Sequence, residues 1–226
     1  MFGHWIPSDV DRRAWRAAPP DGGPGVLVLH AWWGLNDVVR EQCGRLAVLG
    51  YVALAPDLFG TGEVATTVEQ AQQRVETFDE VGIGGPLAGE ALERLLADEA
   101  RTGDAIGAIG FSMGAAWALE LARRTPAFGA VAIYYGTWPQ DYAGLKADVL
   151  GHFAVGDPWE PESRVREQEQ ALRQAGVDVE FHRYAEAKHW FAERDRPEYH
   201  ASSADEAWER TSRFLAARLG PGSGGA

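Results

Sequence analysis

Short apolar segments alternate with longer segments of helical periodicity along most of this chain, and that alternation restricts the possible folds most. Parallel strands are joined by crossover connections, usually helices, so strands and helices in alternation predict an α/β fold. We expect a mostly parallel central sheet with helices on both faces. The expected strands are the apolar runs at 26–30, 51–55, 105–110, 128–135, 151–155 and 179–185, and the clearest expected helices cover 38–49, 113–124, 163–175 and 203–219.

The two ends of the chain are less regular than its middle. With 226 residues the chain is long enough to bury a core of its own, and we expect a single domain over residues 1–219. An edge strand near Trp5–Pro7 is an open expectation, and Thr66 with Glu69 forms a capping-box pattern that predicts the start of a further helix. Residues 220–226 lack core-forming side chains and predict a flexible tail.

The charge and the cysteine content exclude several classes of function. A formal net charge of −12 disfavours nucleic acid and anionic membranes as partners. Cys43 is the single cysteine, so an intrachain disulfide and a multi-cysteine zinc site are excluded. The first residues lack the basic-then-apolar order of a signal peptide, and every apolar run is shorter than a membrane span. We therefore expect a cytoplasmic protein.

The segment Gly110-Phe111-Ser112-Met113-Gly114 is a G-x-S-x-G motif. It stands between an expected strand and an expected helix, where such a motif forms a strained turn that exposes a nucleophilic serine. An ordinary glycine-rich turn with Ser112 as a helix cap is the alternative. A catalytic serine needs a histidine to take its proton and a carboxylate to orient that histidine. The motif therefore directs attention to histidines and acids later in the chain.

Four histidines follow Ser112, and His189 stands just beyond the expected strand at 179–185. That position is the carboxyl edge of the sheet, where the sites of α/β proteins form. His152 and His182 lie within expected strands, where a structural role is the better interpretation. His200 lies in a polar stretch and is expected to be solvated. His189 is therefore the candidate base.

Asp157 occupies the equivalent position after the expected strand at 151–155, and Pro158 prevents that strand from continuing. It lies between Ser112 and His189, which is the chain order serine, acid, histidine of hydrolases with this motif. A simple Asp-Pro turn is the alternative interpretation. The fallback acids are Asp148, Asp141 and Asp178.

A tetrahedral intermediate on the serine needs two backbone N–H donors for its oxyanion. We expect these donors to be Met113, directly after the serine, and Trp32, in the loop after the strand at 26–30. Several tryptophans in expected loops near the carboxyl edge favour an apolar, aromatic-lined pocket, although ordinary packing explains part of them. These are Trp32, Trp33, Trp138, Trp159 and Trp190.

With these residues identified, the chain resembles the dienelactone hydrolase family of α/β-hydrolases. The similarity is carried by the segments HAWWGLND, LAVLGYVALAPDLFG, GFSMGAAWALELA, VGDPWEP and YAEAKHWFA, and it covers nearly the whole chain after Val26. The resemblance implies a hydrolase of small esters or lactones that works through an acyl-enzyme. Its triad maps onto Ser112, Asp157 and His189, and it requires no cofactor and no metal.

This chain departs from the family's pattern at positions that bear on its substrate. By this resemblance, the founding enzymes have a cysteine nucleophile and a glutamate that interacts with it. This chain has Ser112 at the position of the cysteine and Ala31 at the position of the glutamate. Two arginines that hold the substrate carboxylate in the archetype align with Val68 and Glu193. The resemblance therefore predicts a serine esterase for neutral substrates. Its expected pocket residues are Ala31, Trp33, Val68, Trp190 and Glu193.

Two other functions are consistent with the same residues. A thioesterase or a peptidase would use the same triad on a different acyl compound. A non-catalytic α/β-hydrolase that binds a small apolar ligand is the alternative from another class, because fold does not fix function. The expected partner in each case is a small molecule, and the sequence leaves monomer and homodimer open.

Overall fold

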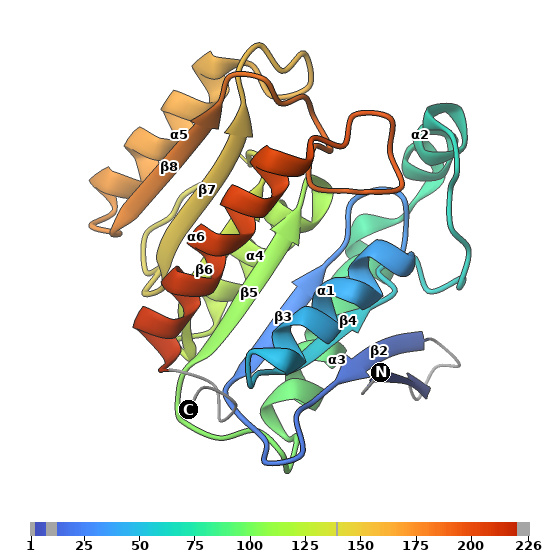
Figure 1. The fold of residues 1–226 in the computed structure, drawn as a ribbon, viewed down its shortest axis with the longest axis vertical. Helices are drawn as coiled ribbons and strands as arrows, with labels where there is room; N and C mark the ends of the chain where they lie inside the picture. The colour runs from blue at the N-terminus through green and yellow to red at the C-terminus, as the bar shows by residue number, and fades with distance from the viewer. Residues whose placement is uncertain (1–2, 8–12, 139, 221–226) are drawn as a thin grey trace. The chain divides into compact units, whose positions relative to one another are not determined.

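The six apolar runs predicted as strands are all strands in the computed structural model, which describes residues 3–7, 13–138 and 140–220 (Figure 1). The strands are β1 Gly3–Pro7, β2 Arg13–Ala17, β3 Gly25–Leu29, β4 Val52–Pro56, β5 Ile106–Phe111, β6 Phe128–Tyr134, β7 Asp148–Ala154 and β8 Val179–Tyr184. The helices are α1 Asp37–Val48, α2 Val68–Thr77, α3 Gly85–Leu96, α4 Met113–Arg124, α5 Glu162–Gln174 and α6 Ala201–Leu219, with a π-helical turn η1 at Glu80–Gly84.

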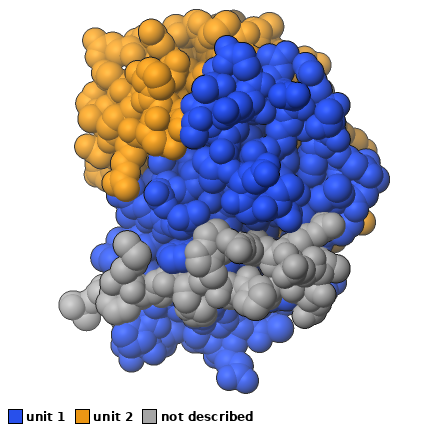
Figure 2. Space-filling view, turned by 90° about the vertical axis from the view of Figure 1, so that its right-hand side faces the viewer, with its two compact units in different colours: residues 1–106, 221–226 blue, residues 107–220 orange. Residues whose placement is uncertain are grey.

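The described chain divides into two compact units, one ending at Ile106 and one covering Gly107–Gly220 (Figure 2). We describe each unit by itself. The single domain expected over residues 1–219 stays a prediction. Of the expected flexible tail, residues 221–226 lie outside the described residues.

In the first unit, the strands lie in the order β1-β2-β4-β3. The pair β3 and β4 is parallel, whereas β1 and β2 form an antiparallel extension. The expected edge strand is therefore confirmed as β1. Helices α1 and α3 pack against β3 and β4, whose side chains are fully buried.

In the second unit, the strands lie in the order β5-β6-β7-β8, and the pairs β6-β7 and β7-β8 are parallel. Helices α4 and α6 both pack against β6, and in Figure 1 α6 passes in front of that strand while α4 lies behind it. Helix α5 packs on β8. This is the predicted arrangement, and it brings the loops that follow β5, β6, β7 and β8 to one edge.

Within the described part of the chain, no helix combines the length and the apolar character needed to cross a bilayer.

Helix α2 begins one residue later than the capping-box pattern indicates. Thr67, not Thr66, is the N-cap, and its hydroxyl accepts a hydrogen bond from the Gln70 backbone N–H at 3.3 Å. Gln70 Oε1 in turn accepts from the Thr66 backbone N–H at 2.9 Å. The Thr-Thr pair offers two registers, and in the observed one Gln70 bonds to both threonines, to Thr67 through its backbone N–H and to Thr66 through its side chain.

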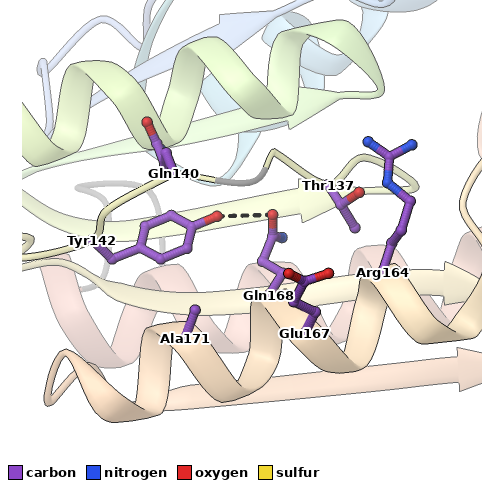
Figure 3. Close-up of a pocket in the computed structure, with 7 residues that line it drawn as sticks. All are labelled: Thr137, Gln140, Tyr142, Arg164, Glu167, Gln168 and Ala171. Carbon is purple, nitrogen blue, oxygen red and sulfur yellow. Dashed lines mark hydrogen bonds between the residues drawn. The ribbon is translucent and has the colours of Figure 1, made fainter.

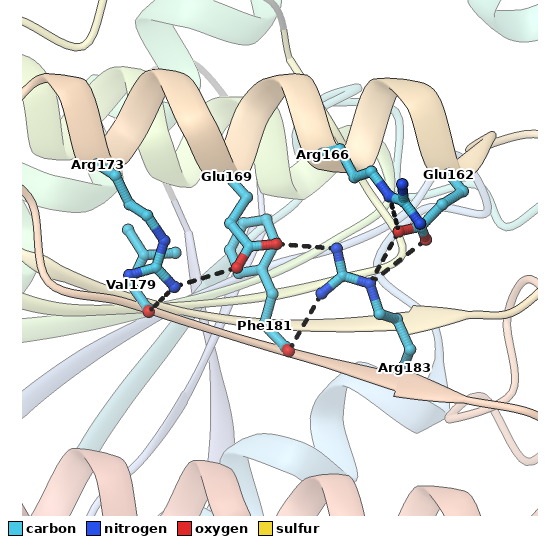
Figure 4. A network of polar contacts seen from close by, with 7 residues as sticks. All are labelled: Glu162, Arg166, Glu169, Arg173, Val179, Phe181 and Arg183. Carbon is cyan, nitrogen blue, oxygen red and sulfur yellow. Dashed lines mark hydrogen bonds and ion pairs between the residues drawn. The ribbon is translucent and has the colours of Figure 1, made fainter.

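Ion pairs tie α5 to β8 (Figure 4). Arg183 of β8 donates to Glu162 Oε1 at 3.1 Å and to Glu169 Oε2 at 2.8 Å, and both acceptors belong to α5. Arg173 of α5 returns a hydrogen bond to the Val179 carbonyl at 2.9 Å. Because α5 begins directly after the loop that follows β7, these contacts help to fix that loop relative to the end of β8.

Replacing Arg183 with methionine is expected to lower the free energy of unfolding by about 1 kcal/mol, because two charge-assisted hydrogen bonds are lost at a part-buried position. Arg166→Met is the matched control, since Arg166 pairs with Glu162 but is 75% exposed, against 27% for Arg183. We expect the control to cost less than about 0.5 kcal/mol. Urea unfolding of both variants makes the comparison, and equal losses would contradict it.

Candidate active site

The G-x-S-x-G segment forms a sharp turn between β5 and α4. Ser112 has a φ of 48°, in the region that L residues rarely adopt. A Cβ atom on Gly110 would come within 3.0 Å of the Gly114 carbonyl and the Ala115 backbone, so the strand and helix cross too closely for any side chain there. Ser112 stands at the N-cap position of α4, but in the described structure it makes no cap hydrogen bond. The simple helix-cap interpretation is therefore not supported.

The Ser112 hydroxyl belongs to a chain of hydrogen bonds with the two other predicted residues. Its Oγ lies 3.1 Å from His189 Nε2, and His189 Nδ1 lies 2.7 Å from Asp157 Oδ2. Both His189 and Asp157 are almost completely buried, with exposures of 4% and 5%. All three residues belong to the second unit. With Nδ1–H donating to the carboxylate, Nε2 is left as the acceptor that faces the serine hydroxyl.

The second carboxylate oxygen of Asp157 is held by its own loop. Oδ1 accepts from the backbone N–H groups of Trp159 at 2.8 Å and Glu160 at 3.3 Å. Both contacts are local, so the turn that Pro158 begins also orients the carboxylate. Asp157 thus has one oxygen for the loop and one for His189.

The remaining candidates have other contacts. His152 is fully buried between Tyr184 and Thr211, and burial lowers the pKa of its imidazole well below the usual value. His182 contacts Glu180, and His200 bonds to Ser203 as α6 begins, so His200 is not simply solvated as expected. The fallback acids Asp148 and Asp178 pair with Arg218, and Asp141 accepts from the Ala143 backbone N–H.

The loop after β6 is bound to the loop that carries Asp157. Glu160 accepts hydrogen bonds from the Thr137 backbone N–H at 3.0 Å and from the Thr137 hydroxyl. Burial raises the pKa of Glu160, and the Thr137 bonds oppose that shift. Thr137 also borders a cavity of about 130 Å³, where the amide oxygen of Gln168 accepts from the Tyr142 hydroxyl and the Trp138 backbone N–H (Figure 3). None of the three candidate triad residues lines this cavity, and the hydrogen bonds to Gln168 hold the loop after β6.

A larger cavity of about 510 Å³ lies beside His189 and Asp157, between the loops that follow β7 and β8. Trp159, which is 45% exposed, and the buried Trp190 are part of its lining. Their ring centroids are 5.6 Å apart, and Trp159 is 6.2 Å from the His189 ring. Trp190 therefore lines a cavity next to the candidate base, and its role as a substrate-pocket residue stays a prediction. Trp138, by contrast, is 43% exposed in the loop after β6.

The predicted residues of the first unit lie in and after the loop that follows β3. Ala31 and Trp33 are buried, Trp32 is part-buried against Trp33, and Val68 is the part-exposed first residue of α2. The role of Trp32 as an oxyanion donor and the pocket roles of Ala31, Trp33 and Val68 stay predictions.

Sequence reasoning missed the residue that shapes this loop. His30 is fully buried, and its Nε2 accepts from the Leu58 backbone N–H at 2.9 Å. Its Nδ1 therefore carries the proton and donates to the Ala31 carbonyl at 2.6 Å. Burial also lowers the pKa of His30, which favours this neutral form. The position of His30 at the end of an apolar strand was the available signal.

Glu193, which was expected as a pocket residue, is a buried carboxyl with a partner inside the protein. It is 3% exposed, and its Oε1 accepts a hydrogen bond from the Tyr135 hydroxyl at 3.1 Å. Burial, followed by the charge of Asp195, raises the pKa of Glu193 to about 8. At neutral pH this carboxyl is therefore mainly protonated. Its part in substrate selection stays a prediction.

Among the described residues, no cluster of three or more histidine, cysteine or carboxylate side chains has the geometry of a metal site.

Gly110→Ala is expected to lower the free energy of unfolding by about 2–4 kcal/mol, because the new Cβ would overlap the α4 backbone. Gly89→Ala is the control, since that helical glycine has open space within 4 Å. Alanine there should stabilise the protein by about 0.5–1 kcal/mol. Denaturant unfolding measures both changes. A Gly110→Ala variant with the wild-type free energy of unfolding would contradict the close crossing of β5 and α4.

The buried Glu193 carboxyl predicts a pH-dependent stability. Its pKa of about 8 in the folded protein lies above the ordinary 4.5, so its stabilising effect is complete below pH 4.5 and is lost as the pH rises towards 8. Relative to Glu193→Gln, the wild type should lose up to about 1.4 kcal/mol of unfolding free energy per pH unit across this window. Urea unfolding of both proteins at a series of pH values measures the difference, and parallel pH curves would refute the prediction.

Comparison with known proteins places this architecture in a family. The family model described as "Dienelactone hydrolase family" matches residues 13–219. A "Putative carboxymethylenebutenolidase" of Methylorubrum extorquens is 33% identical over 87% of this chain and 74% of its own length, and one of Escherichia coli K12 is 31% identical over 91% and 82%. The crystal structure of a "Putative Dienelactone Hydrolase" from Klebsiella pneumoniae superposes with a TM-score of 0.83 at 25% identity, covering 95% of this chain and 98% of that one. The chain therefore has the α/β-hydrolase fold and belongs to the dienelactone hydrolase family of carboxylic ester hydrolases.

Proposed function

We propose that this protein hydrolyses small, neutral carboxylic esters or lactones through an acyl-enzyme on Ser112. The observation that carries the proposal is the continuous chain of hydrogen bonds from the Ser112 hydroxyl through His189 to Asp157. Two of its three members are buried, so water competes little for the hydrogen bond that orients the imidazole. Membership of a family of ester hydrolases supports the same reaction.

In the acylation step, Ser112 Oγ attacks the ester carbonyl while its proton passes to His189 Nε2. Asp157 stabilises the imidazolium through Nδ1–H, and the N–H groups of its own loop keep the carboxylate oriented. Collapse of the tetrahedral intermediate returns the proton from Nε2 to the leaving alkoxide. A lactone opens at this step and keeps both parts on one molecule.

In the deacylation step, His189 Nε2 takes a proton from water, and the resulting hydroxide attacks the acyl-enzyme. The proton then returns to Ser112 Oγ as the carboxylic acid leaves. For both steps we propose the backbone N–H groups of Met113 and Trp32 as oxyanion donors. Met113 is the first residue of α4, so its N–H also has the favourable dipole of a helix N-terminus.

The proposal of a neutral substrate depends on the two positions that align with the carboxylate-binding arginines of the family archetype. Val68 cannot bind a carboxylate, and Glu193 is already hydrogen-bonded to Tyr135. A substrate carboxylate moved into an aromatic-lined, partly dry site without a cation would lose several kcal/mol of hydration. We therefore propose that loss of the cations, more than repulsion by Glu193, directs the enzyme to uncharged esters.

Ser112→Ala is expected to lower kcat on a neutral aryl ester by at least about a thousandfold, because the nucleophile is lost without loss of core volume. Ser212→Ala is the matched control, since that serine hydroxyl donates to the Trp208 carbonyl within α6. The control should retain its activity, and both variants should keep a thermal midpoint within a few degrees of wild type.

Retention of more than a tenth of the wild-type rate by Ser112→Ala would overturn the proposed nucleophile. The same assay with a matched thioester and amide separates an esterase from a thioesterase or a peptidase. Wild-type protein that binds an apolar ligand but hydrolyses none of the three substrates would favour the non-catalytic alternative. Cytoplasmic location, and a monomeric or homodimeric state, stay predictions from the sequence.

A further inference from the structure

The backbone of residues 134–136, at the end of β6, lies directly against the nucleophile turn. The Ser112 N–H donates to the Tyr134 carbonyl at 2.9 Å. A Cβ on Gly136 would overlap the Ser112 carbonyl, so this segment and the turn are in close contact. Tyr135 between them has a φ of 38°, and its N–H donates to the His152 carbonyl at 2.8 Å. The strained backbone of Tyr135 is therefore held on both sides.

The side chain of Tyr135 extends from this segment to the candidate base. Its ring centroid lies 5.1 Å from that of His189, at an interplanar angle of 56°, and 5.4 Å from that of Phe191. Tyr135 is fully buried. The same residue thus neighbours Ser112 through its backbone and supports the imidazole through its ring.

The hydroxyl of Tyr135 contacts the loop that carries His189. It donates to Glu193 Oε1, and the Glu193 N–H donates to the Trp190 carbonyl at 2.9 Å. Trp190, directly after His189, has a φ of 64°. The loop from His189 to Glu193 therefore includes a strained residue and is held by a buried hydrogen bond four residues after the histidine.

We propose that Tyr135 and Glu193 are positioning residues, which hold the His189 imidazole in line with Ser112 through a buried Tyr–Glu hydrogen bond. This inference rests on the proposed esterase function. Glu193 thereby has a role different from that of a substrate anchor, because its carboxyl binds the protein's own tyrosine.

Two further observations fit this role. Burial raises the pKa of Tyr135 well above its usual value, so its hydroxyl remains a donor across the working pH range. Glu193 Oε1 can accept from it whether the carboxyl is protonated or ionised. A displacement of about 1 Å between nucleophile and base lowers rates by about a hundredfold, so a partly released loop should affect chemistry more than binding.

Three variants test the proposal in the full-length protein with a neutral aryl ester. Tyr135→Phe removes the donor and keeps the ring, and Glu193→Leu removes the acceptor and keeps the volume. Glu193→Gln keeps an acceptor oxygen at the same place. We expect the first two to lower kcat about tenfold with KM changed less than about twofold, and Glu193→Gln to stay within about threefold of wild type. The rate of covalent labelling of Ser112 by a fluorophosphonate should fall in parallel with kcat.

Thr211→Val is the matched control for general destabilisation. The Thr211 hydroxyl is fully buried and bonds to the Tyr134 hydroxyl at 2.8 Å and to His152 Nε2 at 3.0 Å. It should lower the thermal midpoint about as much as Tyr135→Phe and leave kcat unchanged. A Tyr135→Phe variant with wild-type kcat, a Glu193→Gln variant as impaired as Glu193→Leu, or an equal loss in Thr211→Val would each overturn the proposal. A wild-type protein without turnover or labelling would instead overturn the esterase function on which it rests.

Discussion

The close crossing of β5 and α4 is the constraint on which the candidate site depends. Gly110 has no room for a Cβ, and Ser112 has a φ of 48°, so the strand ends and the helix begins within one residue. This turn directs the serine hydroxyl away from a capping position and towards His189. Gly136 extends the same constraint to the end of β6, because any larger residue would displace the Ser112 backbone. The rare backbone geometry of Ser112 is maintained by the close packing of the end of β5, the start of α4 and the end of β6.

The base and the acid depend on that turn in different ways. Asp157 is oriented mainly by its own loop, through the N–H groups of Trp159 and Glu160, and Glu160 in turn binds Thr137. The imidazole of His189 packs against the Tyr135 ring, and the loop that carries it is bonded to the Tyr135 hydroxyl through the Glu193 carboxyl. The loop after β6 therefore contacts the surroundings of all three triad residues. Its position explains why a segment with no catalytic side chain is so thoroughly hydrogen-bonded.

Much of the fold was predictable, because burial and periodicity are local properties of a sequence. The strands at 26–30 and 128–135, the helix at 113–124 and the triad residues at strand ends all follow from short patterns with a known physical cause. The first residue of α2 was not predictable, since Thr66 and Thr67 are equivalent as caps until the position of Gln70 is known. Glu193 was expected to face the substrate because it aligns with an arginine of the family archetype, and its sequence position gives no sign of Tyr135, its partner 58 residues earlier. The buried role of His30 likewise depends on Leu58, which only the folded chain brings near.

The most direct test of the central claim is the mass of the intact protein after a rapid acid quench during turnover of an activated neutral ester. A serine hydrolase with the geometry of Ser112 and His189 should gain the mass of one acyl group, and peptide mapping should locate that group on Ser112. Replacing Asp157 with asparagine should slow the appearance of this adduct without moving it to another residue. An adduct on another side chain, or turnover with no acyl-enzyme under any quench time, would contradict the account.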